Sequence, residues 1–354
     1  MNGTILVGTA GQGILRSVDD GATWHRLGLQ EAIEFDGVVR SLAVDHANPA
    51  RIFAGADAGI CLSIDGGTHF ARCDGPANGM TVWALAIDPR DPNIVYAGTG
   101  APSRACMFRS TDGGRAWHQL PIALPEFCSG VHRPRILTIT VDSLDGTVWF
   151  GVEEGGAWRS SDRGDTWERI DQPDSGIVNG DIHAITVLPA GPQGARMHIV
   201  CTVNSVYTNS AGGNGAWEGA SSAERFDGMY YTRTIEALPG PAQTLLLAIG
   251  DGTPGTQSRI YRSIDRGRNW THTLLHAAPN STFWAFGAHA ADPALVFAGT
   301  KYGHLFRSTD GGQSWWKEWR DFSEITAIAW TPFVAQIKAH AQSRLDAPHE
   351  QHHD

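Results

Sequence analysis

Residue types that bind anions, stack on rings or transfer protons recur at two corresponding positions of the chain. The positions belong to seven short apolar segments and lie five and seven residues before the end of each segment. The first position holds Arg40, Trp83, Leu137, His183, Arg233, Trp284 and Thr326. The second holds Val38, Thr81, Arg135, Asp181, Tyr231, Thr282 and Glu324. A purely packed interior would show small or aliphatic residues here, so the two sets predict a polar site.

The basic and aromatic members indicate what such a site would bind. Arg40, Arg135 and Arg233 carry guanidinium groups, which pair in a forked geometry with carboxylate, sulfate or phosphate. Trp83 and Trp284 offer flat faces for a sugar ring or an aromatic group. The predicted ligand is therefore a small anionic molecule that is carbohydrate-derived or aromatic.

Other members are suited to proton transfer. His183 could act as a general acid or base if Asp181 or Glu153 lies within reach. A carboxylate pair, Glu153 with Glu324 or with Asp181, could cleave a glycoside at a suitable separation. We therefore predict catalytic roles for these four residues and for Tyr231. The alternative is that these polar side chains are simply hydrated or paired with one another at a wet channel mouth.

Loops expected on the same face add further candidates, among which Lys301 and Tyr302 are predicted to bind the ligand. The others are Asp57, Arg104, Glu154, Asn204, Asp251, His304, His132 and Arg133. A metal site built from His132, His183 and His304 with Glu153 has no HxH or HExxH spacing to support it. We predict no cofactor and keep a divalent metal only as a weak alternative. The segment 8–13 lacks the Lys and the helix that a phosphate-binding loop requires.

A second pattern explains how these positions could be brought together. The box Ser-x-Asp-x-Gly-x-x-(Trp/Phe) starts at Ser17, Ser63, Ser110, Ser160, Ser263 and Ser308, and a copy without Asp, counted from Ser210, ends at Trp217. The Asp and Ser side chains can bond to backbone N–H groups of a tight turn, and the Gly can adopt positive φ. Each box is therefore predicted to be a turn of the fold and not a catalytic site.

Four short strands are expected per repeat. The innermost strands are predicted at 39–45, 82–88, 136–142, 183–188, 233–238, 284–289 and 325–331, and the next at 51–56, 93–98, 146–151, 196–203, 243–250 and 295–300. The chain begins on a second strand (4–8) and ends on a first strand (325–330). These two terminal segments together complete one four-stranded sheet. The sequence therefore predicts one all-β domain over residues 1–332, a seven-bladed β-propeller of four-stranded antiparallel blades that is closed by pairing of its terminal strands.

The boxes resemble those of the BNR or Asp-box family of β-propellers, and they cover the chain up to about residue 332. That family includes sialidases, twin-propeller xyloglucan-cleaving enzymes, sortilin-type receptors and the photosystem II assembly factor, so the resemblance implies the fold more than the function. Arg40, Arg135, Arg233, Tyr231 and Glu324 mimic the sialidase inventory. Sialidases, however, have six blades and an Arg-Ile-Pro motif that is absent here, and the xyloglucan enzymes need two propellers.

Composition limits the remaining possibilities. The formal net charge of −10 disfavours a nucleic-acid or anionic-membrane surface. The N-terminus shows no leader pattern, and no apolar run is long enough to cross a bilayer, so a cytoplasmic protein is expected. The five cysteines form no CxxC pair, and we expect them to be reduced, mostly buried thiols. Residues 333–354 depart from the repeat; Val334, Ile337, Ala341 and Leu345 could form a short amphipathic helix, followed by a disordered polar end.

The sequence thus predicts a propeller with a small-molecule site at the channel mouth opposite the boxes. A hydrolase or lyase that acts on an anionic compound is slightly favoured over a protein without enzymatic activity. The alternative is a non-catalytic assembly scaffold that binds a protein partner on the propeller rim.

Overall fold

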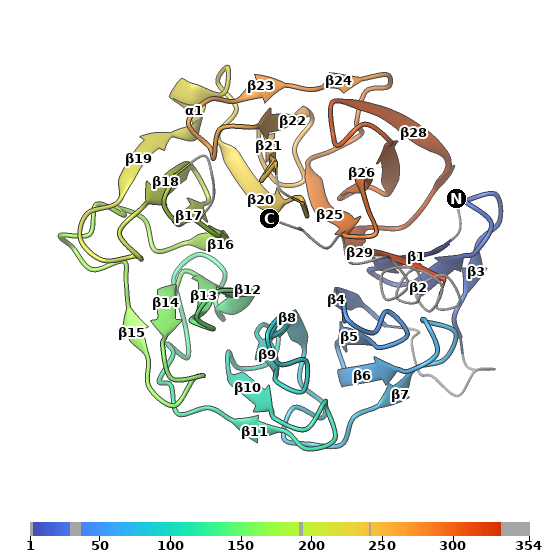
Figure 1. The fold of residues 1–354 in the computed structure, drawn as a ribbon, viewed down its shortest axis with the longest axis horizontal. Coiled ribbons are helices and arrows are strands. Elements are labelled where there is room, and N and C mark those ends of the chain that lie inside the picture. Colours follow the sequence, from blue (N-terminus) through green and yellow to red (C-terminus); the bar gives the residue numbers. More distant parts are fainter. Residues whose placement is uncertain (1–2, 29–36, 191–193, 241, 334–354) are drawn as a thin grey trace, which may run out of the picture.

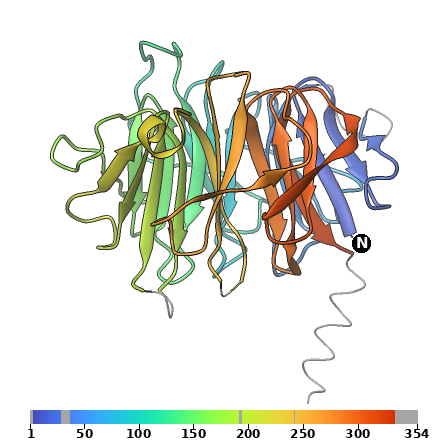
Figure 2. The same ribbon diagram turned by 90° about the horizontal axis from the view of Figure 1, so that it is seen from above.

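The computed structural model describes residues 3–28, 37–190, 194–240 and 242–333. Seven sheets stand around a central axis, each with its innermost strand toward the centre (Figure 1). Seen from the side, the strands run along that axis (Figure 2). The predicted seven-bladed β-propeller is therefore confirmed. No helix of the described residues is long and apolar enough to cross a membrane.

The innermost strands lie close to their predicted bounds. They are β4 (Val39–Val44), β8 (Val82–Ile87), β12 (Arg135–Val141), β16 (Ile182–Leu188), β20 (Tyr231–Ala237), β25 (Phe283–His289) and β29 (Ile325–Pro332). The second strands are β5 (Ile52–Ala56), β9 (Val95–Thr99), β13 (Val148–Glu153), β17 (Met197–Thr202), β21 (Leu245–Gly250), β26 (Asp292–Thr300) and β1 (Gly3–Thr9). Almost every residue of the second strands is buried, because each packs between two neighbouring blades.

The third strands end at the boxes, and the outer strands are mostly very short. The third strands are β6 (Gly59–Ser63), β10 (Met107–Ser110), β14 (Gly156–Ser160), β18 (Ser205–Asn209), β22 (Ser258–Ser263), β27 (His304–Ser308) and β2 (Gly13–Ser17). The outer strands are β7 (Ala71–Arg72), β11 (His118–Gln119), β15 (Glu168–Arg169), β19 (Glu218–Ser221), β23 (Thr271–His272), β28 (Ser314–Asp321) and β3 (His25–Arg26), with β24 (Leu274–Leu275) parallel to β28 and helix α1 at Ser222–Arg225.

The two ends of the described chain close the ring. β29 pairs antiparallel with β1 from Gly3↔Pro332 to Thr9↔Ile325, so one blade contains both chain ends. Ile5 and Val7 of β1 pack in one buried cluster with Ile325, Ile328 and Trp330 of β29. Closure removes the free inner edge that an open array would leave. The predicted tail helix at Val334, Ile337, Ala341 and Leu345 lies outside the described residues.

The boxes are the turns between third and outer strands, as predicted. In the box that follows β10, the Ser110 hydroxyl donates to Asp112 Oδ1 at 2.8 Å and accepts the Gly114 N–H at 2.8 Å. Asp112 Oδ1 also accepts the N–H groups of Arg115 and Ala116, both at 2.9 Å. Gly114 has φ +93°, a conformation that a residue with a Cβ resists. The carboxylates of the boxes therefore fix turns.

The degenerate box is one residue out of the predicted register. Asn209, not Ser210, ends strand β18 and takes the serine's place, because its Oδ1 accepts the N–H groups of Ala211 (2.8 Å) and Gly213 (2.9 Å). Its amide nitrogen also donates to the carbonyls of Asn214 and Ala216 at 2.9 and 3.1 Å. One asparagine side chain thus replaces the bonds that Ser and Asp share in the other boxes.

Candidate functional site

A chain of hollows runs along the axis of the propeller. The first is a cavity of about 560 Å³ at one mouth, lined by loops that precede the innermost strands and by loops that join second and third strands. A smaller hollow of about 220 Å³ lies deeper, and a third of about 400 Å³ opens toward the box face. Since the strands of each blade alternate in direction, the boxes lie on the face opposite the mouth cavity. This arrangement agrees with the expectation from sequence.

All seven residues of the first predicted set line the deeper hollow. They are Arg40, Trp83, Leu137, His183, Arg233, Trp284 and Thr326. In each blade the pairing of the innermost strand skips this residue: for example, Val39 and Ser41 pair with consecutive residues of β5, and Arg40 is left over. Such a β-bulge turns one side chain out of the regular alternation. The bulge therefore aims one side chain per blade into the channel.

The second predicted set is only partly in the mouth cavity. Arg135, Tyr231 and Glu324 line it. Thr81 and Thr282 are buried in the blades and Val38 lies outside the cavity lining, so the alternation argument failed for them. The bulge explains the failure, because it breaks the strict two-residue period on which that argument rests.

Three cations of the mouth are paired with carboxylates. Arg40 Nε lies 3.2 Å from Asp57 Oδ1, Arg135 Nη1 2.6 Å from Glu153 Oε2, and Lys301 Nζ 2.9 Å from Glu324 Oε1. Burial lowers the pKa of Arg40, and the carboxylate of Asp57 opposes that shift. Two of the three predicted anion-binding arginines are thus already neutralised by the protein.

Arg233 differs from the other cations of the mouth. No carboxylate of the described residues pairs with it, and its buried Nε has no hydrogen-bond partner there. Its Cζ lies 4.0 Å from the centre of the Trp284 ring, and Lys301 Nζ lies 4.2 Å from the same ring. The other channel tryptophan, Trp83, is covered in the same way, since the Cζ of Arg40 lies 3.9 Å from the centre of its ring. Cations therefore cover the faces of both tryptophans, and of these cations Arg233 is the one without a carboxylate partner among the described residues.

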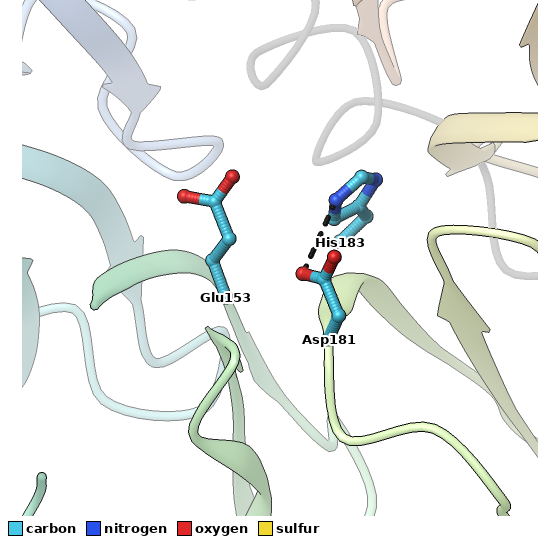
Figure 3. A group of neighbouring side chains, drawn as sticks. All are labelled: Glu153, Asp181 and His183. Carbon is cyan, nitrogen blue, oxygen red and sulfur yellow. Dashed lines mark ion pairs between the residues drawn. The ribbon is translucent and has the colours of Figure 1, made fainter. Parts of the chain in front are cut away.

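Glu153, Asp181 and His183 form a compact group in the channel wall (Figure 3). They come from the end of β13, the loop before β16 and the bulge of β16. One ligand-type atom from each residue lies within 4.8 Å of the others. The figure shows the three side chains pointing toward one common space. Of the predicted carboxylate pairs, the structure brings together Glu153 and Asp181, whereas Glu324 is held by Lys301.

Hydrogen bonding fixes the orientation of the imidazole. His183 is almost fully buried, and its Nδ1 lies 2.7 Å from the carbonyl oxygen of Thr232, which can act only as a hydrogen-bond acceptor. Nδ1 therefore carries hydrogen, and Nε2 faces Asp181 Oδ1 at 3.4 Å. Tyr231 lies against His183, with ring centroids 5.3 Å apart; burial raises the pKa of Tyr231, and Arg233 opposes that shift.

Several predicted loop residues lie elsewhere. Tyr302 is 55% exposed and does not line the mouth cavity, so its predicted ligand contact has no support. His304 Nε2 lies 3.8 Å from Asp321, and His132 contacts Phe127. No group of three metal-type ligands among the described residues contains either histidine. The structure therefore does not bring the three histidines considered from sequence into one group, although His183 and Glu153 lie together.

One channel residue was missed. Glu236, on β20, lines both the deeper hollow and the hollow on the box face. Burial raises its pKa from 4.5 to about 7. The corresponding positions of the other blades hold Ala43, Ala86, Thr140, Thr186, Gly287 and Ala329. A single glutamate among small residues was a detectable signal, but it lies outside the two positions compared.

Comparison with known proteins identifies the repeat. A model of the BNR-Asp box repeat matches residues 260–273. The six bonded Ser–Asp turns and the closed ring agree with this match. The chain carries BNR-Asp box repeats on a seven-bladed β-propeller.

Two curated xyloglucanases are similar to this Asp-box propeller. The xyloglucanase of Hypocrea jecorina (strain QM6a) is 26% identical in an alignment of 307 positions that covers 75% of this chain and 35% of the relative. The oligoxyloglucan-reducing end-specific xyloglucanase of Emericella nidulans is 23% identical in an alignment of 317 positions that covers 84% of this chain and 35% of the relative. The chain therefore spans about a third of the length of these relatives.

Two solved structures show the same fold. The GH74 xyloglucanase from Xanthomonas campestris aligns with a TM-score of 0.63 and 20% identity, over 90% of this Asp-box propeller and 53% of that chain. YCF48 bound to D1 peptide aligns with a TM-score of 0.51 and 19% identity, over 79% of this chain and 82% of that chain. Such identities establish the fold, and function has to be argued from the site.

Proposed function

We propose that the protein binds a small anionic saccharide or a related organic anion in the mouth cavity and acts on it as a hydrolase or lyase. The observation that carries the proposal is the unpaired guanidinium of Arg233 in a cavity whose other cations are paired. Leaving a partly buried charge without a partner is unfavourable, so an anionic group of a ligand is the natural counterpart. The similarity to xyloglucanases supports a saccharide as the class of ligand.

The acidic group supplies the reactive end of the proposed site. Tyr231 contacts both parts of the proposed site: its ring lies 5.3 Å from that of His183 and 6.5 Å from that of Trp284, which Arg233 covers at 4.0 Å. A ligand whose anion rests on Arg233 would therefore present its neighbouring atoms to this group. Glu153 and Asp181 lie on one side of the channel, and Arg135 already neutralises Glu153. This leaves His183 and Asp181 as the residues of the group that face the reacting end of the ligand.

Arg233→Ala tests the proposal directly. Binding should be measured by thermal shift and calorimetry over a panel of uronic-acid oligosaccharides, sugar phosphates, aromatic acids and neutral xyloglucan oligosaccharides. We expect an acidic member to bind and the variant to weaken its binding at least about tenfold, because an ion pair in a partly dry cavity contributes more than about 1.4 kcal/mol. Arg115→Ala, an exposed arginine in a box, is the control.

The result also separates the two classes of function. Binding of an acidic compound with equal affinity in Arg233→Ala would contradict the proposed anion site. The second candidate is a peptide-binding scaffold, which the likeness to YCF48 bound to D1 peptide favours. In that case peptides, and no member of the saccharide panel, would bind, and no panel compound would be turned over.

A further inference from the structure

The group of Glu153, Asp181 and His183 has more acceptors than donors. Asp181 Oδ1 is buried and has no hydrogen-bond donor among the described residues. His183 Nδ1 carries the hydrogen that is donated to the Thr232 carbonyl, so a ring with a single N–H would face Asp181 Oδ1 with the lone pair of Nε2. The carboxylate of Glu153 completes the set. Arg135 compensates the charge of Glu153, but Asp181 Oδ1 has no donor among the described residues, so its lone pairs and that of His183 Nε2 repel each other in this partly buried wall unless a positive species lies between them.

A proton on His183 Nε2 does not satisfy this geometry well. A charge-assisted N–H···O bond closes to about 2.7–2.9 Å. The observed separation of 3.4 Å from Nε2 to Asp181 Oδ1 is clearly longer. Two ligand atoms that each lie about 2.1 Å from one metal ion, however, are about 3.0–3.5 Å apart at octahedral or tetrahedral angles. The spacing of this pair is therefore that of two ligands of a single ion.

The surroundings also resemble those of a metal-binding histidine. A ligating imidazole usually donates its second N–H to a carbonyl or carboxylate, which fixes the ring and the tautomer. The bond from His183 Nδ1 to the Thr232 carbonyl does this at 2.7 Å. Arg135, bonded to Glu153 at 2.6 Å, would fix the third ligand in the same way. Both supporting contacts are present in the chain itself.

We propose that Glu153, Asp181 and His183 bind one divalent transition-metal ion of the Mn²⁺ or Zn²⁺ type. One imidazole nitrogen and two carboxylate oxygens suit such ions better than Ca²⁺, which prefers oxygen ligands alone. Three protein ligands leave coordination positions free, and Glu153 places the site at the edge of the mouth cavity. The ion would be a Lewis acid beside the ligand held by Arg233; only this catalytic use rests on the proposed function.

The full chain, freed of metal by dialysis against a chelator, tests the site. Mn²⁺ binding is measured from the EPR signal of the free ion, and Zn²⁺ binding by calorimetry, for the wild type, Asp181→Asn and His183→Gln. We expect one equivalent in the wild type and affinity at least about tenfold lower in both variants, because each removes a ligand. Glu324→Gln is the matched control, since it removes a mouth carboxylate that Lys301 already holds.

Asp181→Asn keeps the size of the side chain, so the test stands even if His183→Gln folds poorly. The histidines of the C-terminal segment remain in every variant and cancel in the comparison. Absence of saturable binding of either ion to the wild type at millimolar concentration would overturn the proposal, and so would unchanged affinity in Asp181→Asn. Because the titration uses the metal alone, its failure leaves the Arg233-dependent binding of an organic anion standing.

Discussion

Glu236 shows how one residue can set a property of the channel. Its carboxyl group lies in the throat between two hollows, among side chains such as Leu42, Ile139 and Phe286. No ion pair or hydrogen bond of its carboxylate is formed with the described residues. Burial therefore acts on it without compensation and raises its pKa to about 7.

Glu236→Gln should change how stability depends on pH. Because the folded pKa lies above the unfolded one, the folded state binds more protons between about pH 4.5 and pH 7. Stability from this residue is thus fully present below about pH 4.5 and lost as pH rises through about 7. The loss is at most about 3 kcal/mol, and less where water enters the channel.

Denaturant unfolding from pH 4.5 to 8 measures this effect. The variant should match the wild type at the acid end and exceed it by about 1–3 kcal/mol at pH 8. Glu218→Gln, on the exposed strand β19, should follow the wild type throughout. A difference between Glu236→Gln and the wild type that stays constant with pH would show that the carboxyl does not titrate in this range.

For single residues, the sequence predicted where a side chain lies better than it predicted which groups that side chain contacts. The repeat spacing placed Arg40, His183 and Arg233 in the channel, because equivalent positions of equal blades share one environment. The partners of these residues could not be predicted in the same way. Arg135 meets Glu153 through strand register, and the apolar surroundings of Glu236 depend on how the blades converge at the throat.

The box turn is the element that the sequence described most fully. Its residue types predicted the turn, its bonds and its positive-φ glycine, since all of these are local. The register of the degenerate box escaped prediction, because Asn209 replaces two residue types with one side chain. The bulge of the innermost strands also escaped prediction, since it depends on pairing with a partner strand.

Asp112→Ala should weaken the turn after β10. The change removes the acceptor of the Arg115 and Ala116 N–H groups, just before the buried Trp117. Water can replace part of this, so we expect the free energy of unfolding to fall by about 1–2 kcal/mol at pH 7. Asp174→Ala, at an exposed position, is the control and should leave it unchanged.

The same variant has an expected pH signature. The bond from the Ala116 N–H, above all, holds the pKa of Asp112 below its usual value of 3.8. The stabilisation is therefore present above about pH 4 and is lost as pH falls through the lower, folded pKa. Thermal unfolding at pH 7 and pH 3 should show a smaller difference between variant and wild type at pH 3. An equal difference at both values would mean that the charge of Asp112 does not contribute.

At the scale of the whole molecule, the site depends on ring closure. Arg40 and Thr326 face the same hollow although they come from distant parts of the sequence, because β29 lies next to β4 around the axis. Thr326 Oγ1 donates to the Val39 carbonyl, which ties these two innermost strands together. The mouth cavity therefore exists only if β1 holds β29 in place.

A chain that stops after Glu324 should lose both the cooperative fold and the site. It lacks β29, so β1 has an unpaired inner edge and the packing of Ile325, Ile328 and Trp330 is gone. Removal of several buried apolar side chains costs about 2–5 kcal/mol for each, which exceeds the stability of an ordinary domain. Calorimetry should show no cooperative transition, and the protein should aggregate through the open edge.

A control chain that ends after Phe333 retains β29 and should keep a cooperative transition. A cooperative transition in the shorter chain, with anion binding intact, would show that six blades and a lone β1 suffice, and the site would then not require closure.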